Sequence, residues 1–122
     1  MKKIKILIVD DEKDFAEALA ERLELRGLEA EVRTDGETAL VFISETPPDV
    51  VILDIKMPGI DGFEVLRRIK ASHPQLPVIL LTGHSSIKDG IRGMELGAND
   101  YLLKPINIQE LITKVEAAVA AS

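Results

Sequence analysis

The fold is decided at Pro48-Asp49-Val50-Val51-Ile52-Leu53-Asp54-Ile55-Lys56-Met57-Pro58-Gly59. Four consecutive apolar residues, most of them β-branched, are typical of a strand buried on both faces in the middle of a parallel sheet. The run ends at Asp54, and Pro58-Gly59 then predicts a turn. In an open α/β sheet, ligands bind outside the carboxyl ends of the strands, so we expect Asp54 at the rim of a rigid apolar platform. An aspartate at this place can also simply end the strand, and the rest of the chain decides between the two interpretations.

Composition limits what the chain can be. It has 122 residues, 46% of them hydrophobic and 30% charged, as expected for one globular domain over residues 1–122. The formal charge of −6 argues against non-specific binding to nucleic acid. The absence of cysteine excludes disulfides, thiolate zinc sites and thiol nucleophiles. The first apolar run, Ile6–Val9, is too short for a signal peptide or a membrane span, so we expect a cytoplasmic protein.

Strands and helices alternate along the whole chain. The expected strands are Ile4–Val9, Ala30–Thr34 near a sheet edge, the central run from Val50, Pro77–Thr82 and Tyr101–Leu103. A helical pattern follows each of them, and such alternation implies right-handed crossovers with helices on both faces of a parallel sheet. The sequence therefore predicts one three-layer α/β domain.

Each helix pattern also predicts which side chains face the core. In the first helix these are Phe15, Ala18, Leu19, Arg22 and Leu23, and in the last they are Ile108, Leu111, Ile112, Val115 and Val119. In the third helix we expect Phe63, Leu66 and Ile69 inward, with Arg67, Arg68 and Lys70 outward.

Polar residues end four of the expected strands. They are Asp10 and Asp11, Asp54, Thr82, and Lys104. The topological switch of a doubly wound sheet brings such ends into one crevice, where three carboxylates would repel one another without a counter-charge. Mg²⁺ would supply that charge and leave coordination positions for phosphate oxygens. The set favours in-line phosphoryl transfer with Asp54 as nucleophile, although each residue alone could be a local cap or a surface ion pair.

These motifs resemble the receiver domain of bacterial two-component response regulators. The resemblance rests on Asp10-Asp11, Asp54 followed by Met57-Pro58-Gly59, Thr82 and Lys104-Pro105, and it covers nearly the whole chain. It implies a flavodoxin-like (βα)5 fold, a three-layer sandwich whose five-stranded parallel sheet has the order 2-1-3-4-5.

The resemblance also implies roles for the strand-end residues. Asp54 would accept a phosphoryl group from a phosphohistidine of a partner kinase. Asp11 would bind Mg²⁺ directly, Asp10 would help through water, and Asp54 and the backbone carbonyl of Lys56 would complete the protein ligands.

Further residues would act on the phosphoryl group and its signal. Thr82 and Lys104 would contact the phosphoryl oxygens, and Tyr101 would move inward when Thr82 shifts. The Lys104–Pro105 peptide would be cis. Gly83 stands where the family commonly has alanine, which should loosen the loop after Thr82.

Two residues beside the site are expected to influence how fast the phosphoryl group is hydrolysed. By the resemblance these are Lys56 and His84, although the sequence does not give the direction of their effect. His84 could also bind a metal or carry a phosphoryl group itself, but a lone loop histidine is more often only solvated.

Two hypotheses follow about stability. Gly90 and Gly93 each cost about 1 kcal/mol relative to alanine inside a helix, so the fourth helix, roughly Ile87–Leu96, should be the least stable element and the one that reorganises on phosphorylation. If the acids at the strand ends repel one another, Asp11→Asn should raise the stability of the metal-free protein and abolish its stabilisation by Mg²⁺.

The expected function is that of a phosphorylation-controlled switch that helps catalyse its own modification and is not a turnover enzyme. Its partners would be a sensor histidine kinase or phosphotransfer protein and a downstream target or output domain, with no direct contact to nucleic acid or membrane. The signal would pass through the fourth helix, fifth strand and fifth helix, which could also form a phosphorylation-dependent homodimer.

Three alternatives remain open at this point. A Mg²⁺-dependent aspartyl-phosphate phosphohydrolase would need an acid/base aspartate shortly after the nucleophile, where this chain has Lys56. A flavodoxin-like cofactor carrier would need aromatic stacking residues, and the chain has no tryptophan and one tyrosine. A receiver-like binding module that accepts no phosphate is disfavoured by the intact set of Asp11, Asp54, Thr82 and Lys104.

Overall fold

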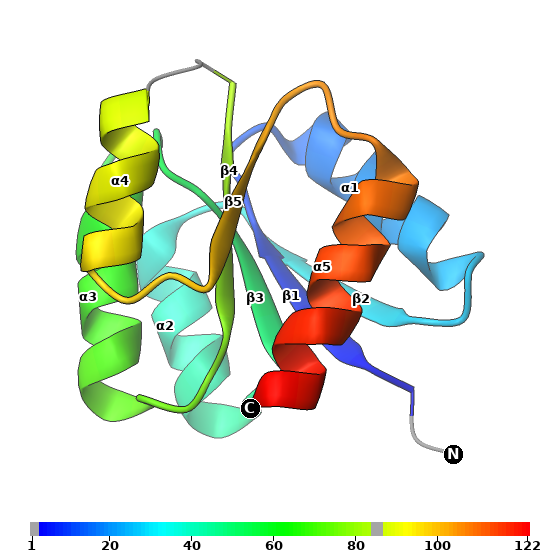
Figure 1. The fold of residues 1–122 in the computed structure, drawn as a ribbon, viewed down its shortest axis with the longest axis horizontal. Coiled ribbons are helices and arrows are strands. Elements are labelled where there is room, and N and C mark those ends of the chain that lie inside the picture. The colour runs from blue at the N-terminus through cyan, green and yellow to red at the C-terminus, as the bar shows by residue number, and fades with distance from the viewer. Residues whose placement is uncertain (1–2, 84–86) are drawn as a thin grey trace.

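The computed structural model describes residues 3–83 and 87–122. In this part of the chain five strands alternate with five helices (Figure 1). They are β1 (Lys5–Val9), α1 (Lys13–Glu24), β2 (Glu29–Arg33), α2 (Gly36–Glu45), β3 (Val50–Asp54), α3 (Gly62–Ser72), β4 (Val78–Thr82), α4 (Ile87–Glu95), β5 (Asp100–Leu103) and α5 (Ile108–Ala121). Among the described residues no helix combines the length and apolarity needed to cross a bilayer.

All strand pairs in the sheet are parallel, and the strand order is β2-β1-β3-β4-β5. This is the order that the resemblance implied, and it places β2 at an edge and β3 in the middle. The order reverses between β1 and β3, so the connection that leaves β1 and the connection that leaves β3 run to opposite faces of the sheet. In open α/β sheets, ligands bind at the rim where such connections diverge.

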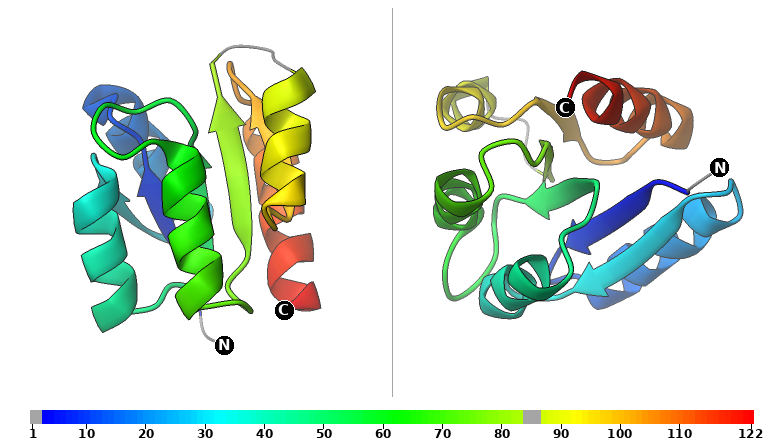
Figure 2. Two further views of the ribbon diagram at one scale, coloured as in Figure 1. Left: turned by 90° about the vertical axis from the view of Figure 1, so that its left-hand side faces the viewer. Right: turned by 90° about the horizontal axis from the view of Figure 1, so that it is seen from below.

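The core has two halves, one on each face of the sheet. Successive residues of a strand point to opposite faces, so Ile6 and Ile8 contribute to one half while Leu7 and Val9 contribute to the other. Helices α1 and α5 cover the first face, and α2, α3 and α4 cover the second (Figures 1 and 2). Because β3 is covered on both faces, all five of its residues are buried, Asp54 included.

The predicted faces of two helices need correction. In α1 the buried residues are Ala16, Leu19, Ala20 and Leu23, whereas Ala18 and Arg22 are exposed and Phe15 is half-buried. Alanines at positions 16, 18 and 20 make the exact direction of this face ambiguous in the sequence. In α3 Lys70 was expected outward, but it is half-buried because its ammonium donates a 2.6 Å hydrogen bond to the carbonyl of Leu76.

The prediction for α5 is confirmed, since Leu111, Ile112 and Val115 are buried and Ile108 and Val119 pack against the same core half.

Helix α3 begins in close contact with the end of β3. Asp61 caps the helix by accepting a 2.9 Å hydrogen bond from the amide of Glu64. The next residue, Gly62, donates its amide hydrogen to the carbonyl of Ile55 at 2.8 Å. A Cβ atom at Gly62 would lie 2.5 Å from the carbonyl oxygen of Asp54, so only glycine permits this approach. The start of α3 therefore fixes the backbone on which Asp54 stands.

The two glycines of α4 also allow close packing. A Cβ atom at Gly90 would lie 2.8 Å from the ring of Tyr101, and one at Gly93 would lie 2.1 Å from Leu80. The helix can therefore pack closely on β4 and β5 only because these side chains are absent. Gly97 follows the end of the helix with a φ of +104°, a conformation that favours glycine.

Candidate functional site at the carboxyl ends of the strands

Four predicted site residues lie at one rim of the sheet. Asp10 directly follows β1, Asp54 ends β3, Thr82 ends β4 and Lys104 directly follows β5. Neighbouring strands are paired in register up to these ends, with Leu53 beside Val9, Asp54 beside Leu81 and Thr82 beside Leu103. The parallel sheet therefore presents all four at the same edge, where Asp10, Asp54 and Thr82 are buried.

Asp54 is 5% exposed and sits between groups of both charges. One carboxylate oxygen accepts a 3.2 Å hydrogen bond from the amide of Lys56, and the other lies 3.7 Å from the ammonium of Lys104. Burial and the negative charge of nearby Asp10 raise the pKa of Asp54 to about 6, against the opposing effects of Lys104 and the Lys56 amide. The carboxyl group is therefore ionised at neutral pH at an energetic cost.

Lys104 provides the positive charge of the site. Its ammonium forms 2.9 Å ion pairs with Asp10 and with Glu12 and lies 4.4 Å from the ring centre of Phe15. Burial acts to lower the pKa of Lys104, but its hydrogen bonds to Asp10 and Glu12, together with the negative charges of Asp54 and Asp10, outweigh burial and raise the pKa. The side chain is 12% exposed, so its charge is only partly screened by water.

The carboxylates that gather here differ from the predicted set by one member. Oxygens of Asp10, Glu12 and Asp54 all lie within 4.8 Å of one another. Asp11 is exposed and does not belong to this group. Its expected role as a direct metal ligand stays a prediction. Replacing Asp11 should relieve little repulsion between carboxylates in the metal-free protein.

Thr82 at the end of β4 and Tyr101 within β5 are the two predicted switch residues. Thr82 is 1% exposed, and its carbonyl accepts a 2.8 Å hydrogen bond from the amide of Lys104. Tyr101 is half-buried, and its ring lies against Gly90 of α4. The Lys104–Pro105 peptide bond is cis, the isomer that the resemblance implied.

Lys56 and His84 are the residues expected to influence hydrolysis, and Gly83 was expected to loosen the loop after Thr82. The side chain of Lys56 is exposed beside the site. Gly83 directly follows β4, and a Cβ atom there would make ordinary van der Waals contact with Lys104 at 3.8 Å. His84 lies outside the described residues.

Sequence reasoning missed two residues that contact Lys104. Glu12 was not assigned to the site, and Phe15 was predicted only as a core residue. The sequence did contain a signal that could have found them, since a helix is expected to begin immediately after Asp10-Asp11. A residue at the helix N-terminus and one three positions later lie on the same side of the first turn.

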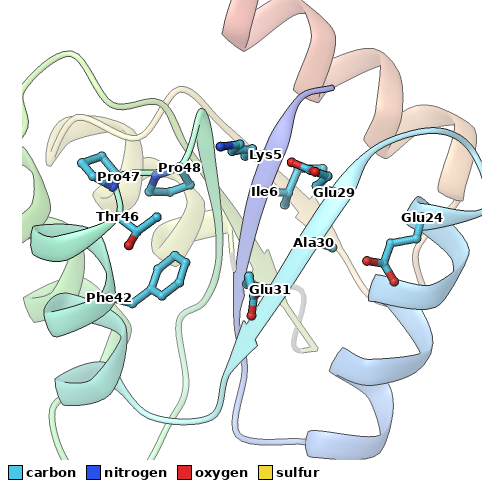
Figure 3. A pocket seen from close by; sticks show the side chains of 10 residues that line it. All are labelled: Lys5, Ile6, Glu24, Glu29, Ala30, Glu31, Phe42, Thr46, Pro47 and Pro48. Atoms are coloured by element: carbon cyan, nitrogen blue, oxygen red, sulfur yellow. The ribbon is translucent and has the colours of Figure 1, made fainter. Parts of the chain in front are cut away.

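A cavity of about 310 Å³ lies elsewhere, at the opposite end of the sheet. Figure 3 shows the side chains that line it, which come from the starts of β1 and β2, the ends of α1 and α2, and the Pro47-Pro48 turn. None of the predicted site residues is among them. The cluster of side chains around Asp54 remains the candidate functional site.

Comparison with known proteins agrees with this arrangement. The family model for the response regulator receiver domain matches residues 6–116. The chain belongs to this family. As a receiver domain it is a component of two-component signal transduction.

Individual relatives of this receiver domain have similar sequences and structures. It is 42% identical over 119 residues to the uncharacterized transcriptional regulatory protein YkoG of Bacillus subtilis, covering 98% of this chain and 52% of YkoG. The receiver domain of the Francisella response regulator 1452 matches with a TM-score of 0.91 and 34% identity over 98% of both chains. The receiver domain of NtrX from Brucella abortus matches with a TM-score of 0.91 and 37% identity, covering 96% of this chain and 99% of the NtrX chain.

This receiver domain spans about half the length of the curated relatives it matches. The fold class is confirmed by both the strand order and these structural matches.

Proposed function

We propose that this receiver domain accepts a phosphoryl group on Asp54 in a Mg²⁺-dependent reaction and thereby switches the surface formed by α4, β5 and α5. The donor would be a phosphohistidine of a sensor histidine kinase or phosphotransfer protein. The observation that carries the proposal is the placement of Asp54, buried on the central strand and 3.7 Å from the ammonium of Lys104.

The chemistry requires an ionised Asp54. One of its oxygens attacks phosphorus, the bond from phosphorus to the imidazole nitrogen breaks, and the imidazole leaves with the electron pair. The amide of Lys56 supports the ionised form by donating to the carboxylate. Lys104 can neutralise phosphoryl oxygens after a small displacement, because it already lies beside the nucleophile.

The donor set fits Mg²⁺, which prefers oxygen ligands and binds through one or two carboxylates. By family resemblance Asp11, Asp54 and the carbonyl of Lys56 would hold the ion, with Asp10 acting through water. When bound, Mg²⁺ would neutralise charge on the carboxylates and on the transferred phosphoryl group. The buried Asp10 and Asp54 support this assignment, since Lys104 is the only cation that pairs with them among the described residues.

Exposed apolar side chains on α4 and β5 support the proposal that this surface binds a partner. Ile91 and Met94 of α4 are 54% and 43% exposed, and Leu103 of β5 is 44% exposed. Thr82 would draw toward the phosphoryl group and Tyr101 would follow, which changes the packing between β5 and α4. The output would be a downstream protein, an output domain or a second copy of the chain.

The domain would act as a self-catalysed acceptor and not as a turnover enzyme. The phosphohydrolase alternative is disfavoured because the exposed Lys56 stands where an acid/base aspartate would be needed.

The test is incubation with Mg²⁺ and acetyl phosphate, followed by intact mass measurement. We expect the mass of one phosphoryl group on the wild type, and no addition on Asp54→Ala or without Mg²⁺. Addition to Asp54→Ala at an equal rate would mean that another residue is modified, and the proposal would be wrong.

A further inference from the structure

We propose that Glu12 is a positioning residue that holds the ammonium of Lys104 away from Asp54 and thereby slows phosphorylation. The inference rests on the proposed function, because it concerns the regulation of the same site.

The distances place Lys104 closer to the start of α1 than to the nucleophile. Its ammonium is 2.9 Å from the carboxylates of Asp10 and Glu12 but 3.7 Å from that of Asp54. The ring of Phe15, on the first turn of α1, lies 4.4 Å from the same ammonium. Three groups at the end of β1 and the start of α1 thus hold the cation in this resting position.

The two close carboxylates are not equivalent. Asp10 is fully buried, and its second oxygen accepts a 2.9 Å hydrogen bond from the amide of Glu12, so it is fixed on both sides. The side chain of Glu12 is 64% exposed. Although Glu12 occupies the N-cap position of α1, its side chain makes no capping hydrogen bond. Glu12 is therefore the partner that can release Lys104 without disturbing the core or the helix.

A phosphoryl group on Asp54 would compete with Glu12 for this ammonium. The phosphoryl group would carry two negative charges where the Asp54 carboxylate carries one. Lys104 would have to leave Glu12 to reach its oxygens. An exposed ion pair has a modest strength, so we expect its loss to accelerate phosphorylation about threefold to fivefold.

Three variants separate this effect from simple charge repulsion. Glu12→Gln removes the charge, whereas Glu12→Asp keeps the charge and shortens the side chain by one methylene group. Asp14→Asn is the matched control, because Asp14 is an exposed acid on the first turn of the same helix. Rates are measured by intact mass with acetyl phosphate at saturating Mg²⁺.

We expect both Glu12 variants to be phosphorylated faster than the wild type and Asp14→Asn to match it. If Glu12→Gln is faster but Glu12→Asp equals the wild type, repulsion of the anionic donor explains the result and the positioning role is wrong. Equal rates in all variants overturn the role while leaving the proposed function intact. A wild type that takes up no phosphoryl group overturns both.

A second measurement does not depend on phosphorylation. The Nζ signal of Lys104, observed by nitrogen-15 NMR in metal-free protein, reports how well the ammonium is held through its proton exchange with water. We expect faster exchange in Glu12→Gln and Glu12→Asp than in Asp14→Asn. Unchanged exchange in both Glu12 variants contradicts the proposal even if their phosphorylation rates differ.

Discussion

Asp54 combines two opposing properties at the scale of a single residue. Its burial raises the pKa to about 6 from 3.8, yet a nucleophilic carboxylate must be ionised. The folded state therefore binds a proton more tightly than the unfolded state does. Stability falls as the pH rises from about 4 to about 6, and the loss is complete above that range.

Replacing this carboxyl group should stabilise the domain at neutral pH. We expect Asp54→Asn to raise the free energy of unfolding by the order of 2 kcal/mol at pH 7.5, and by less at pH 5, where much of the folded wild type is already protonated. Urea unfolding at the two pH values measures the effect. An equal gain at both would show that the change acts through packing and not through the charge of Asp54.

Sequence could predict the strand-end residues but not all their contacts. Asp10, Asp54, Thr82 and Lys104 were found because the backbone of a parallel sheet delivers them to one edge. The helix start after Asp10-Asp11 indicates that Glu12 and Phe15 share one side of the first turn, but their contacts with Lys104 also depend on side-chain conformation and on the position of α1, which the sequence pattern does not give. The half-buried Lys70 was missed for a similar reason, since its acceptor is the carbonyl of Leu76 beyond the end of α3.

At the scale of elements, the two glycines of α4 have different effects in an isolated helix and in the folded domain. In an isolated helix Gly90 and Gly93 are only weak helix formers. In the domain they are the places where Tyr101 and Leu80 approach the helix. The hypothesis that α4 is the least stable element and reorganises on phosphorylation stays a prediction, and its stability is tested by comparing its hydrogen exchange with that of α5.

Alanine substitution distinguishes the two roles of these glycines. Helix propensity alone predicts that Gly93→Ala stabilises the domain by about 1 kcal/mol. Because the added methyl group would overlap Leu80, we expect destabilisation by about 1–3 kcal/mol instead. Urea unfolding measures the change, with Lys88→Ala on the exposed face of α4 as the control. A more stable Gly93→Ala variant would contradict the packing role.

At the scale of the whole molecule, the fold followed closely from sequence. No end of an observed strand differs by more than one residue from the expected end, because turn or polar residues bound each strand. The strand order itself came from family resemblance, since alternation of strands and helices fixes a parallel sheet but not its permutation.

Metal binding should be visible as a change in the stability of the whole domain. A ligand that binds only the folded state stabilises it by about 1.4 kcal/mol at ten times its dissociation constant, so Mg²⁺ should raise the melting temperature by several degrees. We expect Asp11→Asn to abolish this rise. Because Asp11 is exposed and lies outside the group of close carboxylates, the variant should melt like the wild type without metal.

Thermal melting of the wild type and Asp11→Asn with and without Mg²⁺ checks both the response to the metal and the stability of the metal-free variant. A clearly higher melting temperature of metal-free Asp11→Asn would instead support the repulsion predicted from the sequence. A full response to Mg²⁺ would remove Asp11 from the ligand set.

The absence of a side chain at Gly62 has a consequence for signalling. The first turn of α3 lies against the carbonyl of Asp54, so a shift of the central strand toward α3 would meet this close contact. If Asp54 is phosphorylated as proposed, we expect the backbone around it to stay in place. The rearrangement would then occur on the other side of Asp54, toward β4 and β5.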